Sequence, residues 1–268
     1  MGREGRSHGR GPCPMAAVPS RCPSVMKHLL IIGRPGVGKT TLMKRLTQAL
    51  RGQSIDGFLT EEFREEEQRV GFWLSSLDGR QVLLAHRRMG HGPRVGPYRV
   101  NVDVLEQVAV SIIQRGIQQA FLLFLDELGN MELCSRVFQA AVQEAFDRGP
   151  SIVATAGISP KPFLTALKRR KDVELIPLSS ANREVVEEEL TARLQALCAE
   201  DEAVRELQRQ ADRICEMIVS GEVPLIDIEI QQAKLREAAA RTFPDKQAAY
   251  QLIYESRFRR LWQQFRHG

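Results

Sequence analysis

The chain has 268 residues, 43% hydrophobic and 26% charged, with no apolar run long enough to cross a bilayer. Its formal net charge of +5 is spread along the sequence: residues 1–25 hold four Arg and one Glu, and residues 195–268 hold 11 basic and 12 acidic side chains. Because no segment has the concentrated positive charge of a nucleic-acid-binding surface, we expect neither nucleic acid nor a membrane as partner.

The five cysteines, Cys13, Cys22, Cys134, Cys198 and Cys215, form no C-x-x-C pair and have no metal-ligand spacing. We therefore expect a reducing, cytoplasmic location. Residues 1–25 are rich in Gly, Arg, Pro and Ser and lack the apolar segment of a secretory signal, which predicts a disordered tail with Met15 or Met26 as an alternative start. The Arg content also fits an amphipathic targeting segment, but the repeated Pro and Gly argue against a helix there.

The ordered part is expected to begin with a buried strand over 28–32, followed by a glycine-rich segment and a helix over 42–50. Three β-like runs follow at 57–64, 69–77 and 81–85, and the charged or glycine-containing turns between them predict a small antiparallel meander.

From residue 101 the pattern alternates between helix and strand. We expect a helix over 102–115 that ends at Gly116, an apolar strand over 120–125, and a helix from Ser135 to about Gly149. A strand over 151–156, a helix over 161–170, a strand over 173–178 and a helix from about 181 complete the alternation. This order predicts a parallel sheet covered by helices on both faces, hence an α/β fold.

The last 70 or so residues have the pattern of an all-helical extension. Apolar residues recur at helical spacing on two stripes, Val204, Leu207, Ala211, Ile214 and Ile218, and then Tyr250, Tyr254, Phe258, Leu261 and Phe265. Pro224 and Pro244 stand where new helices are expected to begin.

A complete Walker A pattern, G-x-x-x-x-G-K-T, lies between the first strand and the first helix. We expect the nucleotide phosphates to be bound by Gly33, Arg34, Pro35, Gly36, Val37, Gly38, Lys39, Thr40 and Thr41. Glycines allow backbone N–H groups to surround an anion, and the helix N-terminus adds positive potential. Lys39 is the expected catalytic cation at the β- and γ-phosphates, and the Thr40 hydroxyl is an expected ligand of Mg²⁺.

Two acidic residues follow the apolar strand over 120–125. Asp126 is expected to hold Mg²⁺, and Glu127 to activate the attacking water as the catalytic base. An adjacent water-activating carboxylate favours hydrolysis over phosphorylation of an acceptor. We therefore predict a Mg²⁺-dependent enzyme that hydrolyses a nucleoside triphosphate.

Several separated segments resemble nucleoside-triphosphatases of the THEP1 type. The similar segments are 33–42, 57–64, 69–72, 95–98, 126–133 and Asn182-Arg183. The resemblance implies an ASCE-type P-loop NTPase fold with a small β insertion, and hydrolysis of several nucleoside triphosphates, ATP and GTP among them, to diphosphate and phosphate. Asn130 departs from the family pattern, where Lys is expected, and the chain after Leu194 exceeds the usual family length. We accordingly expect a tail at 1–25, a P-loop NTPase domain at 26–194 and a helical extension at 195–268.

Other functions remain open at this point. The protein could instead be a nucleotide or nucleoside kinase, or a nucleotide-dependent switch that binds a protein partner through its helical extension. Arg183 is a candidate arginine finger, although a surface arginine at a helix start is the commoner case. Glu132 is a candidate supporting acid for which an exposed loop position is an equally good interpretation. The stretch 60–62 is a candidate cover for the nucleotide base, and a solvated strand face explains it almost as well. The basic run 168–171 and the terminal arginines 257, 259 and 260 are interpreted as helix ends and faces rather than ligand sites.

Overall fold

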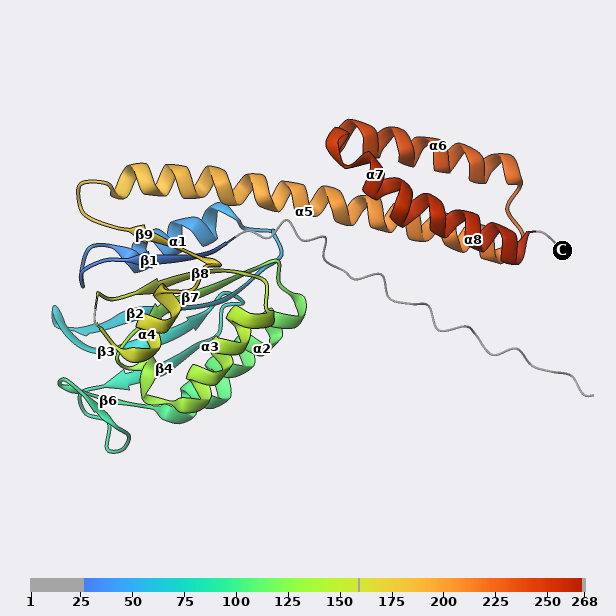
Figure 1. The fold of residues 1–268 in the computed structure, drawn as a ribbon. Coiled ribbons are helices and arrows are strands. Elements are labelled where there is room, and N and C mark those ends of the chain that lie inside the picture. Colours follow the sequence, from blue (N-terminus) through green and yellow to red (C-terminus); the bar gives the residue numbers. More distant parts are fainter. Residues whose placement is uncertain (1–26, 159, 267–268) are drawn as a thin grey trace, which may run out of the picture.

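The structure is a computed structural model that describes residues 27–158 and 160–266, so the predicted tail over 1–25 and the alternative starts Met15 and Met26 lie outside the described residues. An α/β body is followed by a projecting helical unit (Figure 1). The strands are β1 (His28–Ile32), β2 (Ile55–Glu65), β3 (Gln68–Ser76), β4 (Gln81–His86), β5 (Arg94–Val95), β6 (Tyr98–Val100), β7 (Leu122–Leu128), β8 (Ser151–Ala156) and β9 (Val173–Pro177). The α-helices are α1 (Lys39–Ala49), α2 (Val110–Gln119), α3 (Arg136–Arg148), α4 (Pro162–Lys168), α5 (Arg183–Ser220), α6 (Leu225–Thr242), α7 (Gln247–Tyr250) and α8 (Ser256–Phe265).

Within the described residues the strands form one mixed sheet in the order β5-β6-β4-β3-β2-β7-β8-β1-β9. The half of the sheet from β2 through β7, β8 and β1 to β9 is parallel. The other half, from β2 through β3, β4 and β6 to β5, is antiparallel. The predicted meander is therefore present, with β5 and β6 as further strands that the sequence analysis missed. It is continuous with the parallel sheet, because the start of β2 pairs with β7 (Ile55 with Leu122) and the rest of β2 pairs with β3.

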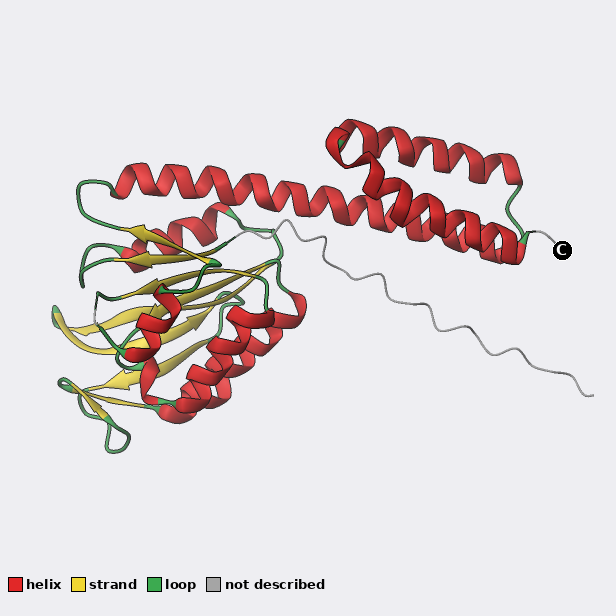
Figure 2. Ribbon diagram, viewed as in Figure 1, coloured by secondary structure: helices red, strands yellow, loops and turns green. Residues whose placement is uncertain are grey.

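The sheet is covered on both faces, as the alternation of helix and strand predicts (Figure 2). Alternate residues of β1 enter different cores, because successive side chains of a strand point to opposite faces. Leu29 and Ile31 pack with residues of α1 and the first half of α5, whereas Leu30 packs with residues of α2 and α3. Both cores consist of fully buried aliphatic and aromatic side chains, so the strand ends that carry the candidate site rest on a rigid support.

Gly116 lies inside α2 and does not end it, so the predicted helix end is wrong. A Cβ built on Gly116 would lie 2.5 Å from Cδ1 of Leu123 on β7. Glycine is used here because the helix approaches the sheet closely, and the helix continues to Gln119. The segment before α2, Val104–Ala109, is a π-helix. Ser135, by contrast, caps α3 as predicted, since its hydroxyl accepts a hydrogen bond from Phe138 N at 3.0 Å.

A single 38-residue helix, α5, joins the α/β body to the helical unit. Its first half packs in the core that contains α1, and its second half packs against α6 and α8 in a third core. That third core contains most of the two predicted apolar stripes, among them Leu207, Ile214 and Phe258, whereas Phe265 is exposed. Helical segments begin at or just after Pro224 and Pro244, as predicted. The predicted boundary between 194 and 195 falls within α5, and the division into domains stays a prediction.

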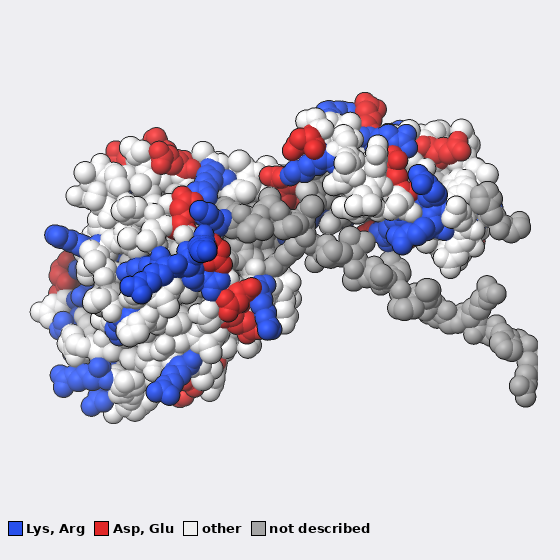
Figure 3. Space-filling model, viewed as in Figure 1, with Lys and Arg blue, Asp and Glu red and all other residues white. Residues whose placement is uncertain are grey.

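The surface shows both signs of charge. On the face drawn in Figure 3, basic and acidic side chains are interspersed over the α/β body and the helical unit. None of the helices in the described residues combines the length and apolar character needed to span a membrane.

Candidate functional site

The glycine-rich loop connects β1 to α1 and brings the nine predicted phosphate-binding residues together. Gly36 and Gly38 have φ values of 78° and 101°, which side chains with a Cβ rarely adopt. A Cβ on Gly33 would lie 2.8 Å from the carbonyl oxygen of Leu178, so this loop packs closely against the segment after β9. Lys39 is the first residue of α1, and the loop therefore surrounds a helix N-terminus, as an anion site requires.

Lys39 is only 5% exposed and reaches across the loop toward the end of β7. Its ammonium lies 3.4 Å from the carbonyl oxygens of Gly33 and Arg34 and 3.7 Å from Oε1 of Glu127. The structure thus brings together the two residues that the sequence analysis assigned to catalysis, although they are 88 positions apart in the numbering.

Asp126 is fully buried near the end of β7, which runs on to Leu128. Its Oδ1 accepts a hydrogen bond from Thr155 Oγ1 at 2.5 Å, whereas Oδ2 has no hydrogen-bond partner among the described residues. Burial raises the pKa of Asp126 to about 6, and the hydroxyls of Thr155 and Thr40 act in the opposite direction. A buried carboxylate oxygen without a partner calls for an explanation, and its place beside the phosphate loop makes Asp126 a candidate metal ligand.

Thr155 was missed by the sequence analysis. It is a fully buried polar residue in the otherwise apolar part of β8, directly beside β7 in the sheet. A single polar side chain within an apolar strand is the signal that could have identified it. Thr60 also contacts this position, since its hydroxyl donates to the backbone oxygen of Asp126 at 2.7 Å.

Glu132 is buried beside the two acids of β7 instead of lying on an exposed loop. Its Oε2 accepts a hydrogen bond from Gly129 N at 3.0 Å, which holds the turn after β7. Burial raises the pKa of Glu132 to about 8, and the negative charges of Glu127 and Asp126 contribute in the same direction. Asn130, where the family pattern has Lys, is exposed on the same turn.

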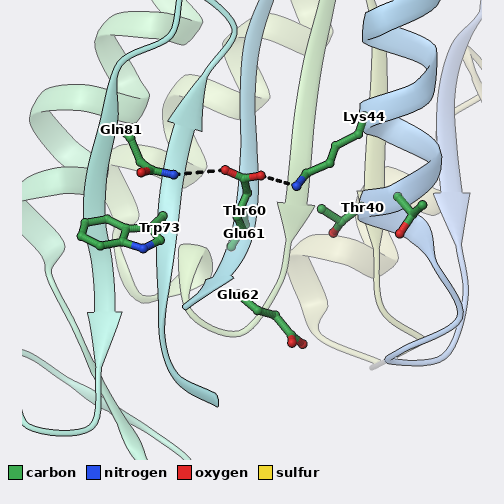
Figure 4. Close-up of a pocket in the computed structure, with 8 residues that line it drawn as sticks. Thr40, Lys44, Thr60, Glu61, Glu62, Trp73 and Gln81 are labelled. Atoms are coloured by element: carbon green, nitrogen blue, oxygen red, sulfur yellow. Dashed lines mark hydrogen bonds and ion pairs between the residues drawn. The ribbon is translucent and has the colours of Figure 1, made fainter. Parts of the chain in front are cut away.

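A polar hollow of about 390 Å³ adjoins the start of α1 and the strands β2 and β3 (Figure 4). It is lined by Thr40, Thr41, Lys44, Thr60, Glu61, Glu62, Trp73 and Gln81. The Glu61 carboxylate lies between Lys44 and Gln81. It forms an ion pair with Lys44 and accepts a hydrogen bond from Nε2 of Gln81 at 3.1 Å. The candidate stretch 60–62 thus borders the phosphate loop.

The remaining basic candidates divide into two groups. Arg183, at the start of α5, lies beside Gly38 of the phosphate loop. Lys168, Arg170 and Arg257 are held in local contacts: Lys168 donates to Gly157 O, Arg170 pairs with Asp147 and Asp172, and Arg257 pairs with Asp212. Such contacts fit the helix-end and surface interpretation of the basic runs.

The chemistry of the site fits a hard cation held partly by water and phosphate. Thr40 and Asp126 could supply oxygen ligands, the type that Mg²⁺ prefers, because Oδ2 of Asp126 has no hydrogen-bond partner among the described residues. No group of three or more His, Cys, Asp or Glu side chains in the described part of the chain is arranged as an all-protein metal cage.

Comparison with known families matches residues 28–191 to the NTPase family. Nucleoside-triphosphatase THEP1 of Thermotoga maritima is 44% identical over 155 residues, which are 58% of this chain and 88% of that protein. The cancer-related nucleoside-triphosphatase homolog of Mus musculus is 32% identical over 188 residues, covering 63% of this chain and 97% of the mouse protein.

Two solved structures have the same fold. The crystal structure of THEP1 from Aquifex aeolicus is 33% identical with a TM-score of 0.56, and covers 62% of this chain and 98% of its own. The solution structure of a human cancer-related nucleoside triphosphatase is 30% identical with a TM-score of 0.55, and covers 63% and 98%. The family match ends at residue 191, inside α5, so most of that helix and the helices after it lie beyond it.

Proposed function

We propose that this chain, which belongs to the NTPase family and is a nucleoside-triphosphatase, hydrolyses ATP, GTP and other nucleoside triphosphates with the help of Mg²⁺. The observation that carries the mechanism is the meeting of Lys39, Asp126 and Glu127 at the phosphate loop. The amides of residues 33–41 and the Lys39 ammonium bind the phosphates, and positioning and charge stabilisation supply most of the catalysis.

Thr40 and Asp126 would hold Mg²⁺. The cation would neutralise charge on the phosphate oxygens when bound. The unpartnered Oδ2 of Asp126 supports this assignment, and the hydrogen bond from Thr155 orients the carboxylate so that Oδ2 stays available. Thr155 would therefore position the ligand without contacting the nucleotide.

Glu127 would act as the general base. Its carboxylate is a third exposed, so water can reach it while it stays next to Lys39. In the proposed step the water oxygen forms a bond to the γ-phosphorus, the bond from that phosphorus to the bridging oxygen of the β-phosphate breaks, and the proton of the water passes to Glu127.

Phosphate release from ATP, GTP, CTP and UTP, measured with Mg²⁺ and with EDTA, tests this proposal. Wild-type protein should release phosphate from several nucleotides only with Mg²⁺, and Glu127→Gln should reduce the rate about 10²–10⁴-fold. Tight nucleotide binding by a wild-type protein that releases no phosphate from any of the four would refute the hydrolase mechanism.

The finer fold assignment is ASCE-type. It is supported by the strand order, because β8 lies between β1, which leads into the phosphate loop, and β7, which carries Asp126 and Glu127. A cytoplasmic location is supported by the free thiols of Cys134, Cys198 and Cys215, which suit a reducing compartment.

Phosphoryl transfer to a small acceptor is a second candidate function, favoured by the hollow beside Thr40. Its volume of about 390 Å³ lies within the range of small-molecule sites, about 300–1,000 Å³. Trp73 could stack on a planar acceptor, and Glu61 and Gln81 could bind its hydroxyl or amino groups. Transfer from [γ-³²P]ATP to an added nucleoside, faster than hydrolysis and lost in Trp73→Ala, would establish it; water as the only acceptor would exclude it.

The helical unit is proposed to bind a protein partner. Apolar side chains on its surface support this role, since Ile226 is 61% and Leu252 is 76% exposed. A partner isolated with wild-type protein should be lost with Ile226→Asp while basal hydrolysis is retained; equal capture by both proteins would contradict the role of this surface.

A further inference from the structure

Arg183 lies directly against the phosphate loop. A Cβ added to Gly38 would be 3.3 Å from Cδ of Arg183 and 3.5 Å from its Nη1. Gly38 is the residue immediately before Lys39, so the guanidinium of Arg183 is next to the part of the loop that meets the phosphates.

The backbone at Arg183 is fixed by its neighbour. The side-chain oxygen Oδ1 of Asn182 accepts hydrogen bonds from Ser179 N at 2.7 Å and Ser179 Oγ at 2.9 Å, and the side-chain nitrogen Nδ2 donates to Pro177 O at 2.9 Å. These bonds close the turn between β9 and α5, and the same turn touches the loop at Gly33 through Leu178. Arg183 is therefore held over the loop by a rigid connection.

Among the described residues, no carboxylate pairs with the charge of Arg183. Four other arginines of α5, at positions 193, 205, 209 and 213, each form an ion pair with a carboxylate. Arg183 is half-buried, yet within residues 27–158 and 160–266 it has neither a carboxylate partner nor a side-chain hydrogen bond. A partly buried cation without a counter-charge is unfavourable, which indicates an anionic ligand.

We propose that Arg183 is a catalytic residue supplied by the same chain, and that its guanidinium binds phosphate oxygens of the nucleotide. The inference rests on nucleotide binding at the loop, as described under the proposed function. The planar guanidinium matches two phosphate oxygens, and it stays protonated throughout. While the bond from the γ-phosphorus to the bridging oxygen breaks, Arg183 stabilises the charge that moves onto the β-phosphate and transfers no proton.

Arg183→Ala and Arg183→Lys test the proposal, with Arg213→Ala as a matched control because Arg213 lies on the same helix and is 66% exposed. Two quantities are measured: kcat/KM for ATP and GTP with Mg²⁺, and the affinity for inorganic tripolyphosphate by calorimetry. Arg183→Ala should lower kcat/KM about 100-fold and weaken tripolyphosphate binding about tenfold. Arg183→Lys should retain more binding than rate, and the control should match wild type.

Two results would overturn the proposal. Weaker binding of ATP and GTP with unchanged tripolyphosphate affinity would place the guanidinium on the nucleoside, and values equal to those of Arg213→Ala would make Arg183 an ordinary surface residue. Circular dichroism confirms folding; if Arg183→Ala does not fold, Arg183→Lys alone carries the comparison. Because tripolyphosphate binding needs no hydrolysis, it decides the contact of Arg183 even if the wild-type protein releases no phosphate.

Discussion

The ammonium of Lys39 lies 3.7 Å from the Glu127 carboxylate, so the proposed phosphate-binding cation and the proposed general base are paired with each other. We expect a bound triphosphate to compete with Glu127 for Lys39 and so to leave the Glu127 carboxylate available to the attacking water.

Glu127→Gln is therefore expected to bind ATP somewhat more tightly than wild type. Removal of the competing carboxylate should lower Kd about two- to fivefold, the size expected for a partly exposed ion pair. Calorimetric titration with a non-hydrolysable ATP analogue measures it. Weaker binding by Glu127→Gln would show that the pair does not compete with the nucleotide.

Asp126→Asn should remove most of the effect of Mg²⁺ on nucleotide affinity. Wild-type protein is expected to bind the ATP analogue at least about tenfold more tightly with Mg²⁺ than with EDTA. In the variant, the ratio of the Kd in EDTA to the Kd in Mg²⁺ should approach one. The control is Asp147→Asn, since Asp147 pairs with Arg170 away from the loop. A variant that keeps the wild-type ratio would exclude Asp126 as a ligand.

Glu132→Gln should change how stability depends on pH. The folded protein holds the Glu132 proton up to a pKa of about 8, whereas the unfolded chain loses it near 4.5. Between these values the unfolded state binds fewer protons, so this group lowers the free energy of unfolding as pH rises. Urea denaturation in EDTA at pH 5 to 8 should show a flatter profile for the variant. Parallel profiles would mean that the carboxyl ionises normally in the fold.

Gly116→Ala should destabilise the protein by about 1–2 kcal/mol, despite the better helix propensity of alanine, because the new Cβ would lie 2.5 Å from Leu123 Cδ1. Gly90→Ala is the control, since a Cβ there meets nothing within 4 Å. Thermal unfolding compares the two variants. Equal melting temperatures would show that the helix can move away from the sheet at little cost.

Phe258→Ala should loosen the helical unit and leave hydrolysis largely intact. Phe258 is buried in the third core, so its truncation is expected to cost about 3–5 kcal/mol. Hydrogen exchange should then show lost protection in α6 and α8, with Phe265→Ala, at a 44% exposed residue, as the control. An equal loss of protection in β1 and β7 would show that both parts unfold together.

The predictions that succeeded from sequence rest on local chemistry. The glycine-rich loop joins a buried strand to a helix as predicted, and Asp126 and Glu127 lie near the carboxyl end of the buried strand β7, while phosphate binding by the loop stays a prediction. Ser135 capped its helix for the same reason, since the group that it satisfies is three residues away.

Other features depend on contacts between distant segments, which local patterns do not contain. Gly116 looks like a helix end by propensity, but the approach of Leu123 determines its role. The pairing of β2 with β7 joins residues more than sixty positions apart, and the sequence analysis expected a separate insertion there. The buried environment of Glu132 likewise arises only when the turn after β7 folds back on its own strand.

Because α5 is one continuous helix, its length sets the distance between the phosphate loop and the helical unit. At about 1.5 Å per residue its 38 residues span about 57 Å, with Arg183 at one end and the attachment of α6 at the other. Because the first half of α5 packs in the core with α1, the part beyond Cys198, about 33 Å long, projects from the α/β body. The helical unit is thereby held well away from the phosphate loop, where another molecule could contact it without covering the nucleotide.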